Sequence, residues 1–129
     1  ASLENNTLVL FSSEQGAQFP GCKWTNWDAG LHTALLARWS GHIREVQRTS
    51  AILHYADVLL TLIELAGGGV ESRARDGWSF VEVLSGQQKT HRSLSFGMHN
   101  NVPEGPPYPI RSVNNGRYQY IRNLRSDDI

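Results

Sequence analysis

Side chains able to bind a cation or an anion lie close together near the start of the chain. Glu14 and Gln15 directly follow a short apolar segment and precede a glycine. Carboxylate and amide oxygens are ligands that calcium prefers in proteins, but a polar strand end beside a turn has the same composition. Lys23 follows in the next loop, where its compact ammonium suits an anionic oxygen or simply faces solvent. Residue types alone leave a binding site and an ordinary polar loop open.

The other reactive side chains narrow the choice of chemistry. Cys22 is the only cysteine, which excludes an internal disulfide and a cysteine-rich zinc site. Three of the histidines have no visible partner at ligand spacing: His42, His54 and His91. His32 is expected to have a structural role or to face solvent. Trp24 and Trp27 either cover a core or stack on a sugar ring.

Composition excludes two broad classes of partner. The chain has 129 residues, with 12 basic and 12 acidic side chains, so its charge gives no sign of nucleic-acid binding. No apolar run approaches the roughly 20 residues that a membrane helix needs. We therefore expect neither a nucleic-acid partner nor a membrane partner.

Two predicted strands and one helix would position the polar loop. The apolar run Thr7–Ser12 predicts a strand buried on both faces, as in a mostly parallel sheet, and Thr33–Trp39 predicts a second strand. Ser50–Ala66 predicts a helix that is capped by Thr49 or Ser50 and ends at a run of three glycines. Its apolar face is expected to contain Ile52, Tyr55, Ala56, Leu59, Leu62, Ile63 and Ala66.

The last third of the chain predicts antiparallel strands. After a possible short helix at Ser79–Leu84, we expect a strand at Ser93–Met98 and a proline-rich loop at His99–Pro109. A hairpin follows, with strands Ile110–Asn114 and Arg117–Arg122 around an Asn-Gly turn. The predicted class is α/β passing into α+β. We expect one domain, 1–129, in which 1–69 end the α/β part and 70–129 form an antiparallel subdomain.

Six blocks of the chain resemble blocks of the sulfatase family, in the family's order. Asn6–Gly16, which reads NTLVLFSSEQG, is similar to N-T-L-V-x-F-T-S-D-N/H-G. Lys23–Gly30 is similar to K-x-x-x-Y/W-E/D-G/A-G, and Leu35–Ile43 to L-x-x-R-W-P-G-x-I, with Ser40 in place of the usual proline. Glu14 and Gln15 are each one methylene longer than the family's common Asp-Asn or Asp-His pair.

The other three blocks extend the resemblance to the last third of the chain. Asp57–Leu62 resembles the helix D-V/I/L-x-P-T-L/I, with Leu60 in place of proline, and Asp76–Phe80 resembles the turn D-G-x-S-F/L. Tyr108–Val113 is similar to the Y-P-M/I-R-x-V segment of sulfamidases. Each block alone is weak, but six in order identify a C-terminal sulfatase region, most similar to the heparan N-sulfatase branch.

The resemblance implies a fold and a mechanism. The fold is an alkaline-phosphatase-like α/β sandwich followed by a small antiparallel subdomain, and this chain would start at a late strand of the large sheet. The complete enzyme would hydrolyse sulfate esters or sulfamates of sulfated sugars with a formylglycine nucleophile and bound calcium. Glu14 and Gln15 match calcium ligands of the family, and Lys23 matches its sulfate-contacting lysine.

The resemblance also assigns possible sugar contacts. It places His99 at the sugar-binding end of the pocket. Arg111 is expected either in that pocket or on a strand, paired with a carboxylate.

The chain contains only part of the family's site. The C/S-x-P-x-R motif that yields formylglycine is absent, so we expect no catalytic residue in these 129 residues and only weak calcium binding. One alternative is a non-catalytic remnant subdomain that acts as a small oligomeric binding module. An in-frame C/S-x-P-x-R motif encoded upstream would favour the enzyme over the remnant.

The two apolar strands also predict self-association. Their edges and faces would be exposed without the neighbouring strands of a larger sheet, which predicts a homo-oligomer, most simply a dimer. The compartment is undetermined, because relatives of this kind occur in the periplasm, outside the cell or in lysosomes.

Overall fold

The structure, a computed structural model, describes residues 3–69, 76–100 and 106–126. Its contacts separate into two compact units. The first contains Ala1–Leu10 and Ala37–Ser93, and the second contains Phe11–Leu36 and Leu94–Ile129. The division of the domain at residue 69 stays a prediction.

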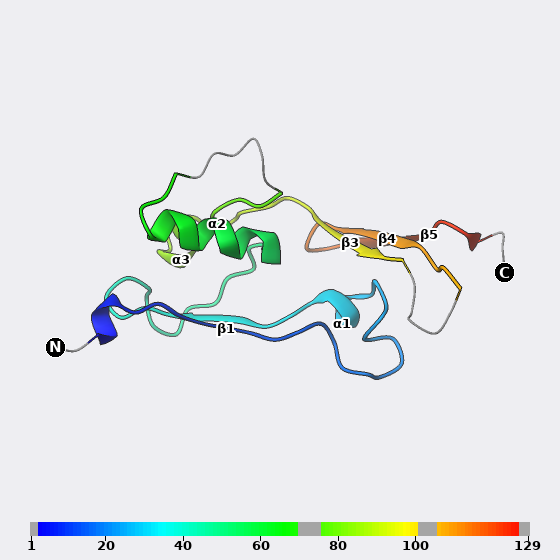
Figure 1. Cartoon of the computed structure of the whole chain (residues 1–129), viewed down its shortest axis with the longest axis horizontal. Helices are drawn as coiled ribbons and strands as arrows, with labels where there is room; N and C mark the ends of the chain where they lie inside the picture. Colours follow the sequence, from blue (N-terminus) through cyan, green and yellow to red (C-terminus); the bar gives the residue numbers. More distant parts are fainter. Residues whose placement is uncertain (1–2, 70–75, 101–105, 127–129) are drawn as a thin grey trace. The chain divides into compact units, whose positions relative to one another are not determined.

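The first half of the chain mixes short helices with two strands, and its last third contains three consecutive strands (Figure 1). In chain order the elements are η1 (Glu4–Asn6), β1 (Val9–Ser12), α1 (Asp28–Leu31), β2 (Leu35–Arg38), α2 (Tyr55–Leu65), α3 (Val81–Leu84), β3 (Ser95–His99), β4 (Ile110–Asn114) and β5 (Gln119–Asn123). Strands β1 and β2 pair in one sheet, and β3, β4 and β5 form a second sheet in that order. This mixture of helices with a C-terminal antiparallel sheet confirms the predicted fold class.

Helix α2 starts five residues later than predicted, at Tyr55 instead of Ser50. The preceding residues are extended because Ile52 forms a β-bridge with Arg92. The helix is capped by a reciprocal pair: the Ala56 N–H donates to His54 Nδ1 (3.4 Å), and the His54 N–H donates to Asp57 Oδ2 (2.8 Å). The prediction that Thr49 or Ser50 caps this helix was therefore wrong.

The buried face of α2 also differs from the predicted one. Asp57, Leu60 and Thr61 are buried, whereas Leu59 and Leu62, expected in the core, are 61% and 43% exposed. The polar residues are buried because they bind the segment that follows residue 76. Thr61 Oγ1 donates to the Asp57 carbonyl (2.8 Å) and accepts the Phe80 N–H (3.0 Å), which draws the 1% exposed Phe80 against the helix.

Helix α3 follows directly after Phe80 and is a single turn. It begins at Val81, two residues after the predicted start, and its Val83 is buried. Together with Leu60 and Phe80, Val83 forms the small apolar core of the first unit.

Strands β1 and β2 are shorter and more exposed than predicted. Val9 and Phe11 on β1 are 52% and 59% exposed, and Leu36 on β2 is 63% exposed. The expectation that β1 is buried on both faces was therefore wrong for the described residues. Ser13 N–H extends the pairing by donating to the Ala34 carbonyl (3.0 Å).

The sheet of the second unit is a regular antiparallel meander, drawn yellow to orange-red in Figure 1. The predicted hairpin is present, but β5 begins at Gln119 and not at Arg117. The turn takes four residues because the Asn115 N–H donates to the Tyr118 carbonyl (3.1 Å), while Asn115 Oδ1 accepts the Tyr118 N–H (2.7 Å). Gly116 has φ of 84°, which glycine adopts without strain.

His99 is the last residue of β3 instead of the first residue of the proline-rich loop. Residues 101–105 of that loop lie outside the described residues. Within the described ranges, no helix has the length and apolar character required to cross a membrane.

Candidate functional site

A tightly turned loop between Gly16 and Gly30 holds Lys23. The Lys23 N–H donates to the Ala17 carbonyl (3.1 Å), and Thr25 Oγ1 donates to the Cys22 carbonyl (2.7 Å). Trp24 has φ of 67°, a left-handed conformation that costs a non-glycine residue on the order of 1–3 kcal/mol. The loop therefore fixes the backbone on both sides of the lysine.

The two tryptophans of this loop were expected either to cover a core or to stack on a sugar ring. Trp24 is 43% exposed and Trp27 is 59% exposed, so neither is a buried core residue. Their open faces leave the alternative, stacking on a sugar ring, as a prediction.

Lys23 and Glu14 form an ion pair. The lysine Nζ lies 3.5 Å from Glu14 Oε1, and the two side chains are 25% and 72% exposed. The structure thus brings the predicted sulfate-contacting cation to a predicted calcium ligand. Gln15, the second predicted ligand, is exposed beside Glu14. An anion placed here would meet the ammonium, and a cation would meet the carboxylate.

The buried Asn26 docks the Lys23 loop on the sheet of the same unit. Asn26 is 1% exposed, and its carbonyl accepts a hydrogen bond from Gln119 Nε2 on β5 (2.6 Å). A Cβ built on Gly97 of β3 would lie 3.5 Å from Asn26 Nδ2 and only 2.6 Å from Leu31 Cδ1. The absence of a side chain at position 97 therefore lets the loop and α1 approach the sheet closely.

The same sheet carries the two predicted sugar contacts. His99 ends β3, and its Nε2 is buried without a hydrogen-bond partner among the described residues. Arg111 Nη1 on β4 donates to the carbonyls of His99 (3.4 Å) and Ile110 (2.8 Å) and to Asn100 Oδ1 (3.0 Å). Arg111 is thus a strand residue, as one alternative expected, but its partners among the described residues are neutral oxygens and not a carboxylate.

All five predicted site residues belong to the second compact unit. Glu14, Gln15 and Lys23 lie in its first segment, and His99 and Arg111 lie in its second. Asn26 joins the two segments, yet the lysine–glutamate pair and the histidine–arginine neighbours make no described contact with one another. Sequence reasoning missed Asn26, although its position three residues after Lys23 inside a family-like block was a usable signal.

The donor set at Glu14 fits part of a calcium site. One carboxylate and one amide supply oxygens of the kind calcium binds, but calcium takes roughly six to eight oxygens in all. No group of three or more His, Cys, Asp or Glu side chains able to hold a metal occurs among residues 3–69, 76–100 and 106–126. The remaining ligands would have to come from elsewhere.

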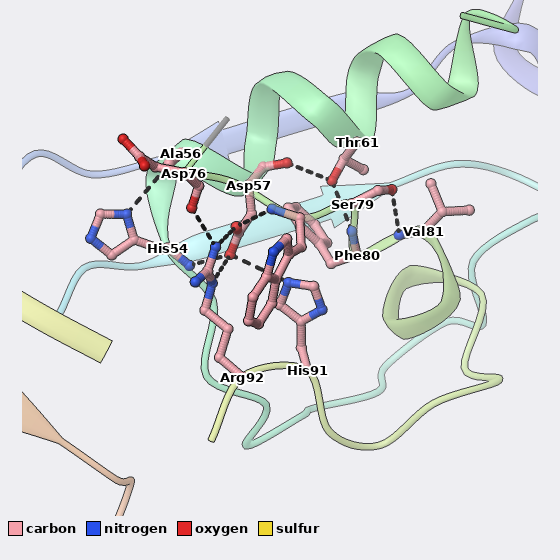
Figure 2. A network of polar contacts seen from close by, with 11 residues as sticks. His54, Ala56, Asp57, Thr61, Asp76, Ser79, Phe80, Val81, His91 and Arg92 are labelled. Atoms are coloured by element: carbon pink, nitrogen blue, oxygen red, sulfur yellow. Dashed lines mark hydrogen bonds and ion pairs between the residues drawn. The ribbon is translucent and has the colours of Figure 1, made fainter. Parts of the chain in front are cut away.

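A second polar cluster, around Asp57, has a structural role (Figure 2). Arg92 and His91 approach the carboxylate of Asp57 at the start of α2, and His91 Nε2 lies 3.4 Å from Oδ2. Burial raises the pKa of Asp57. The hydrogen bond from Arg92, the N–H groups of Trp78 and His54 and the charge of Arg92 outweigh burial, so the pKa lies below its ordinary value of 3.8.

The Arg92 side chain is itself held on three sides. Besides contacting Asp57, its Nη2 donates to the Asp76 carbonyl (3.0 Å), and its guanidinium carbon lies 4.3 Å from the centre of the Trp78 ring. The hydrogen bond to the Asp57 carboxylate raises the pKa of Arg92 above its ordinary value. Because Asp57 is completely buried and its oxygens are all engaged, this cluster leaves no position for a ligand.

Comparison with known proteins finds sulfatases that are similar to most of this chain. An ulvan-active sulfatase from Formosa agariphila is 33% identical over 129 residues, which cover 98% of this chain and 25% of that protein. Arylsulfatase G from Rattus norvegicus is 30% identical over 112 residues, which cover 85% of this chain and 20% of that protein. No family model matches the chain. The chain spans about a quarter or less of the length of these relatives.

Solved structures share the fold. A putative sulfatase from Bacteroides thetaiotaomicron superposes with a TM-score of 0.77 at 22% identity, over 93% of this chain and 27% of that one. A second protein was solved in complex with its substrate D-glucosamine-2-N,6-O-disulfate. It superposes with a TM-score of 0.74 at 20% identity, over 95% of this chain and 26% of that one. A specific relation to heparan N-sulfatases stays a prediction.

Proposed function

This chain is a homologue of the sulfatases over nearly its whole length, and we propose that it forms the C-terminal part of a sulfatase. The complete enzyme would hydrolyse sulfate ester or sulfamate groups of sulfated sugars. Two relatives support that substrate class, since one is named for activity on ulvan and another was solved with a sulfated glucosamine as its substrate.

The observation that carries the proposal is the pairing of Lys23 with Glu14 in a fixed loop. The ammonium, 3.5 Å from the carboxylate and only 25% exposed, is positioned before any substrate arrives. A fixed cation beside a sulfate group stabilises the negative charge that grows on its oxygens as the bond to sulfur breaks. We assign this role to Lys23.

Glu14 and Gln15 would hold one side of a calcium ion. When bound, the ion would supply further positive charge to the sulfate oxygens. Without calcium, the Glu14 carboxylate neutralises the charge of Lys23. The calcium ion and the lysine would therefore share this carboxylate. The formylglycine nucleophile would come from sequence beyond these 129 residues, because no Cys or Ser in them stands in a C/S-x-P-x-R motif.

His99 and Arg111 would contact the sugar itself. Among the described residues, Arg111 has no acidic partner and lies near the backbone of His99, and the buried His99 Nε2 has no hydrogen-bond partner. Asn26 holds the Lys23 loop on the sheet that carries both residues. Strand alternation puts His99 on the same face of the sheet as Gly97, which Asn26 covers. This docking supports a site that combines the sulfate contact of Lys23 with a sugar contact at His99, while Arg111 would contact the sugar from the opposite face.

A second function, a non-catalytic oligomeric binding module, is favoured by one observation. Val9, Phe11 and Leu36 are more than half exposed on the paired strands β1 and β2. Apolar surface of this kind is usually covered by another part of a protein or by a partner. In a remnant that acts without the rest of an enzyme, a second copy would cover it.

The test uses the longer protein that results when upstream coding sequence is included. We expect an in-frame C/S-x-P-x-R motif there, and calcium-dependent release of sulfate from a sulfated glucosamine. Lys23→Gln should lower kcat/KM by about 10²–10³, the usual effect of removing one electrostatic stabiliser. Arg38→Gln, which alters an exposed ion pair with Glu4 on the first unit, is the matched control.

Two results would contradict the proposal. An upstream sequence without the motif and without sulfate release would favour the binding module. An active enzyme in which Lys23→Gln behaves like Arg38→Gln would remove the role assigned to the lysine.

A further inference from the structure

The outer face of the three-stranded sheet combines aromatic rings with arginines. Phe96, Val113 and Tyr120 lie opposite one another across β3, β4 and β5. Phe96 and Tyr120 are 65% and 64% exposed. Side chains alternate between the two faces of a strand, so these three residues point away from the face that Asn26 covers. The ring-bearing surface is therefore open in the second unit.

The next row on this face is positively charged. Arg111 on β4 is in direct register with Arg122 on β5, and Met98 completes the row on β3 with 67% exposure. Like charges directly opposite each other destabilise a sheet. No residue of the three strands is acidic, and Arg122 has no ion-pair partner among the described residues. Within the part of the chain that the structure describes, no acidic side chain therefore compensates the charge of this pair.

We propose that this face binds a sulfated polysaccharide. The choice of ligand rests on the proposed function, which supplies the substrate class, but the surface is separate from the Lys23 loop. An arginine pair of this kind suits a sulfate group, because guanidinium groups bind tetrahedral oxyanions with paired hydrogen bonds. Anion binding also removes the repulsion between Arg111 and Arg122.

The aromatic row fits the sugar part of the same ligand. Two strand spacings separate Phe96 from Tyr120, roughly 10 Å, which is about the length of a disaccharide. The apolar C–H faces of successive sugar rings can therefore lie on the two side chains while a sulfate reaches the adjacent arginine row. A second copy of this chain is a poorer occupant, because face-to-face contact would bring four arginines together.

The test measures binding of dextran sulfate to the full 129-residue chain by calorimetry, with unsulfated dextran and single-stranded DNA as comparisons. We expect dextran sulfate to bind most tightly. Arg122→Gln should weaken binding by roughly tenfold, the loss of one charge-assisted interaction, whereas Arg122→Lys, which keeps the charge but loses the paired hydrogen bonds, should weaken it less. Tyr120→Ala should weaken binding while leaving the charge unchanged, and Arg38→Gln controls for net charge.

Each other outcome overturns the inference. Equal affinity for DNA would make the face a general polyanion or nucleic-acid surface. Unchanged binding in both Arg122→Gln and Tyr120→Ala would place the polymer elsewhere. Sulfate release by the longer protein is measured separately. If the longer protein releases no sulfate but the chain binds dextran sulfate on this face, only the proposed function is contradicted. If the longer protein releases sulfate but the chain does not bind dextran sulfate on this face, only this inference is contradicted.

Discussion

Arg92 holds the carboxylate of Asp57 from a position 35 residues further along the chain. Its Nε lies 2.8 Å from Oδ2, and its Nη2 contacts Oδ1. Asp57 is completely buried and the arginine side chain is 13% exposed. The backbone N–H groups of His54 and Trp78, each at 2.8 Å, complete the environment of the carboxylate. One ion pair therefore joins the start of α2 to the segments on both sides of α3.

Removal of the arginine should strongly destabilise the first unit. Arg92→Leu leaves a buried carboxylate without its cation, which typically costs about 3–5 kcal/mol. Arg38→Gln is the control, because exposed pairs such as Arg38–Glu4 contribute about 0–1 kcal/mol. Urea unfolding monitored by tryptophan fluorescence gives both values. Similar midpoints for the two variants would contradict the structural role of Asp57.

The same pair predicts a loss of stability in acid. Because the pKa of Asp57 is below 3.8 in the folded chain, the unfolded chain binds a proton first as the pH falls. The stabilisation is complete roughly one unit above 3.8 and is lost as the pH falls through 3.8 toward the lower folded value. Asp57→Asn should therefore lose less stability than the native chain between about pH 6 and about pH 3. Parallel losses would show that Asp57 does not titrate as described.

Close packing at Gly97 should be sensitive to a single methyl group. In Gly97→Ala the new Cβ would lie 2.4 Å from Ser112 Oγ and 2.6 Å from Leu31 Cδ1, so the side chains of Ser112 and Leu31 must shift from their positions between the sheet and α1. Overpacking of this kind costs about 1–3 kcal/mol. Gly69→Ala, where nothing lies within 4 Å, is the control. Hydrogen exchange at Gln119 and Asn26 should accelerate in Gly97→Ala only; protection equal to that of the control would contradict the docking.

The exposed strands β1 and β2 predict self-association of the isolated chain. Phe11 and Leu36 are 59% and 63% exposed, and covering a side chain of this size contributes about 1.5–3 kcal/mol. Sedimentation at micromolar concentration should give twice 14.4 kDa or more, and Phe11→Glu with Leu36→Glu should give a monomer. A native chain that sediments as a monomer would mean that these side chains need no partner.

Local signals in the sequence predicted the second sheet well. The Asn-Gly pair at 115–116 located the hairpin, because few residues adopt the backbone that such a turn requires. The strand before it was predicted two residues early at its start and one residue early at its end. Those shifts matter for His99, which belongs to a strand with a fixed partner, Ile110, and not to a loop.

Hydrophobic periodicity failed at α2 for a physical reason. The pattern assigns Asp57 to solvent and Leu59 to the core, and the structure reverses both. A buried aspartate is stable only with partners, and here they come from Trp78 and Arg92, 21 and 35 residues away. A pattern read from neighbouring residues therefore cannot predict that Asp57 is buried.

The candidate site was predictable only through the family-like blocks. Lys23 and Glu14 are nine positions apart, and no helical or strand period brings them together; the loop geometry does. Asn26 was not predicted, because its only signal was its position inside a family-like block, and a single polar residue in a polar loop carries no local sign of burial. Its role follows from contact with Gln119, 93 residues later.

The central claim is that these residues supply one part of a sulfatase site and that the nucleophile lies outside them. Its most direct test measures release of a chromophore from an aryl sulfate, with calcium, by the 129-residue chain alone and by the protein extended upstream. The account predicts background release by the chain alone, since no activated nucleophile is present, and turnover by the extended protein. Turnover by the 129-residue chain alone would contradict it.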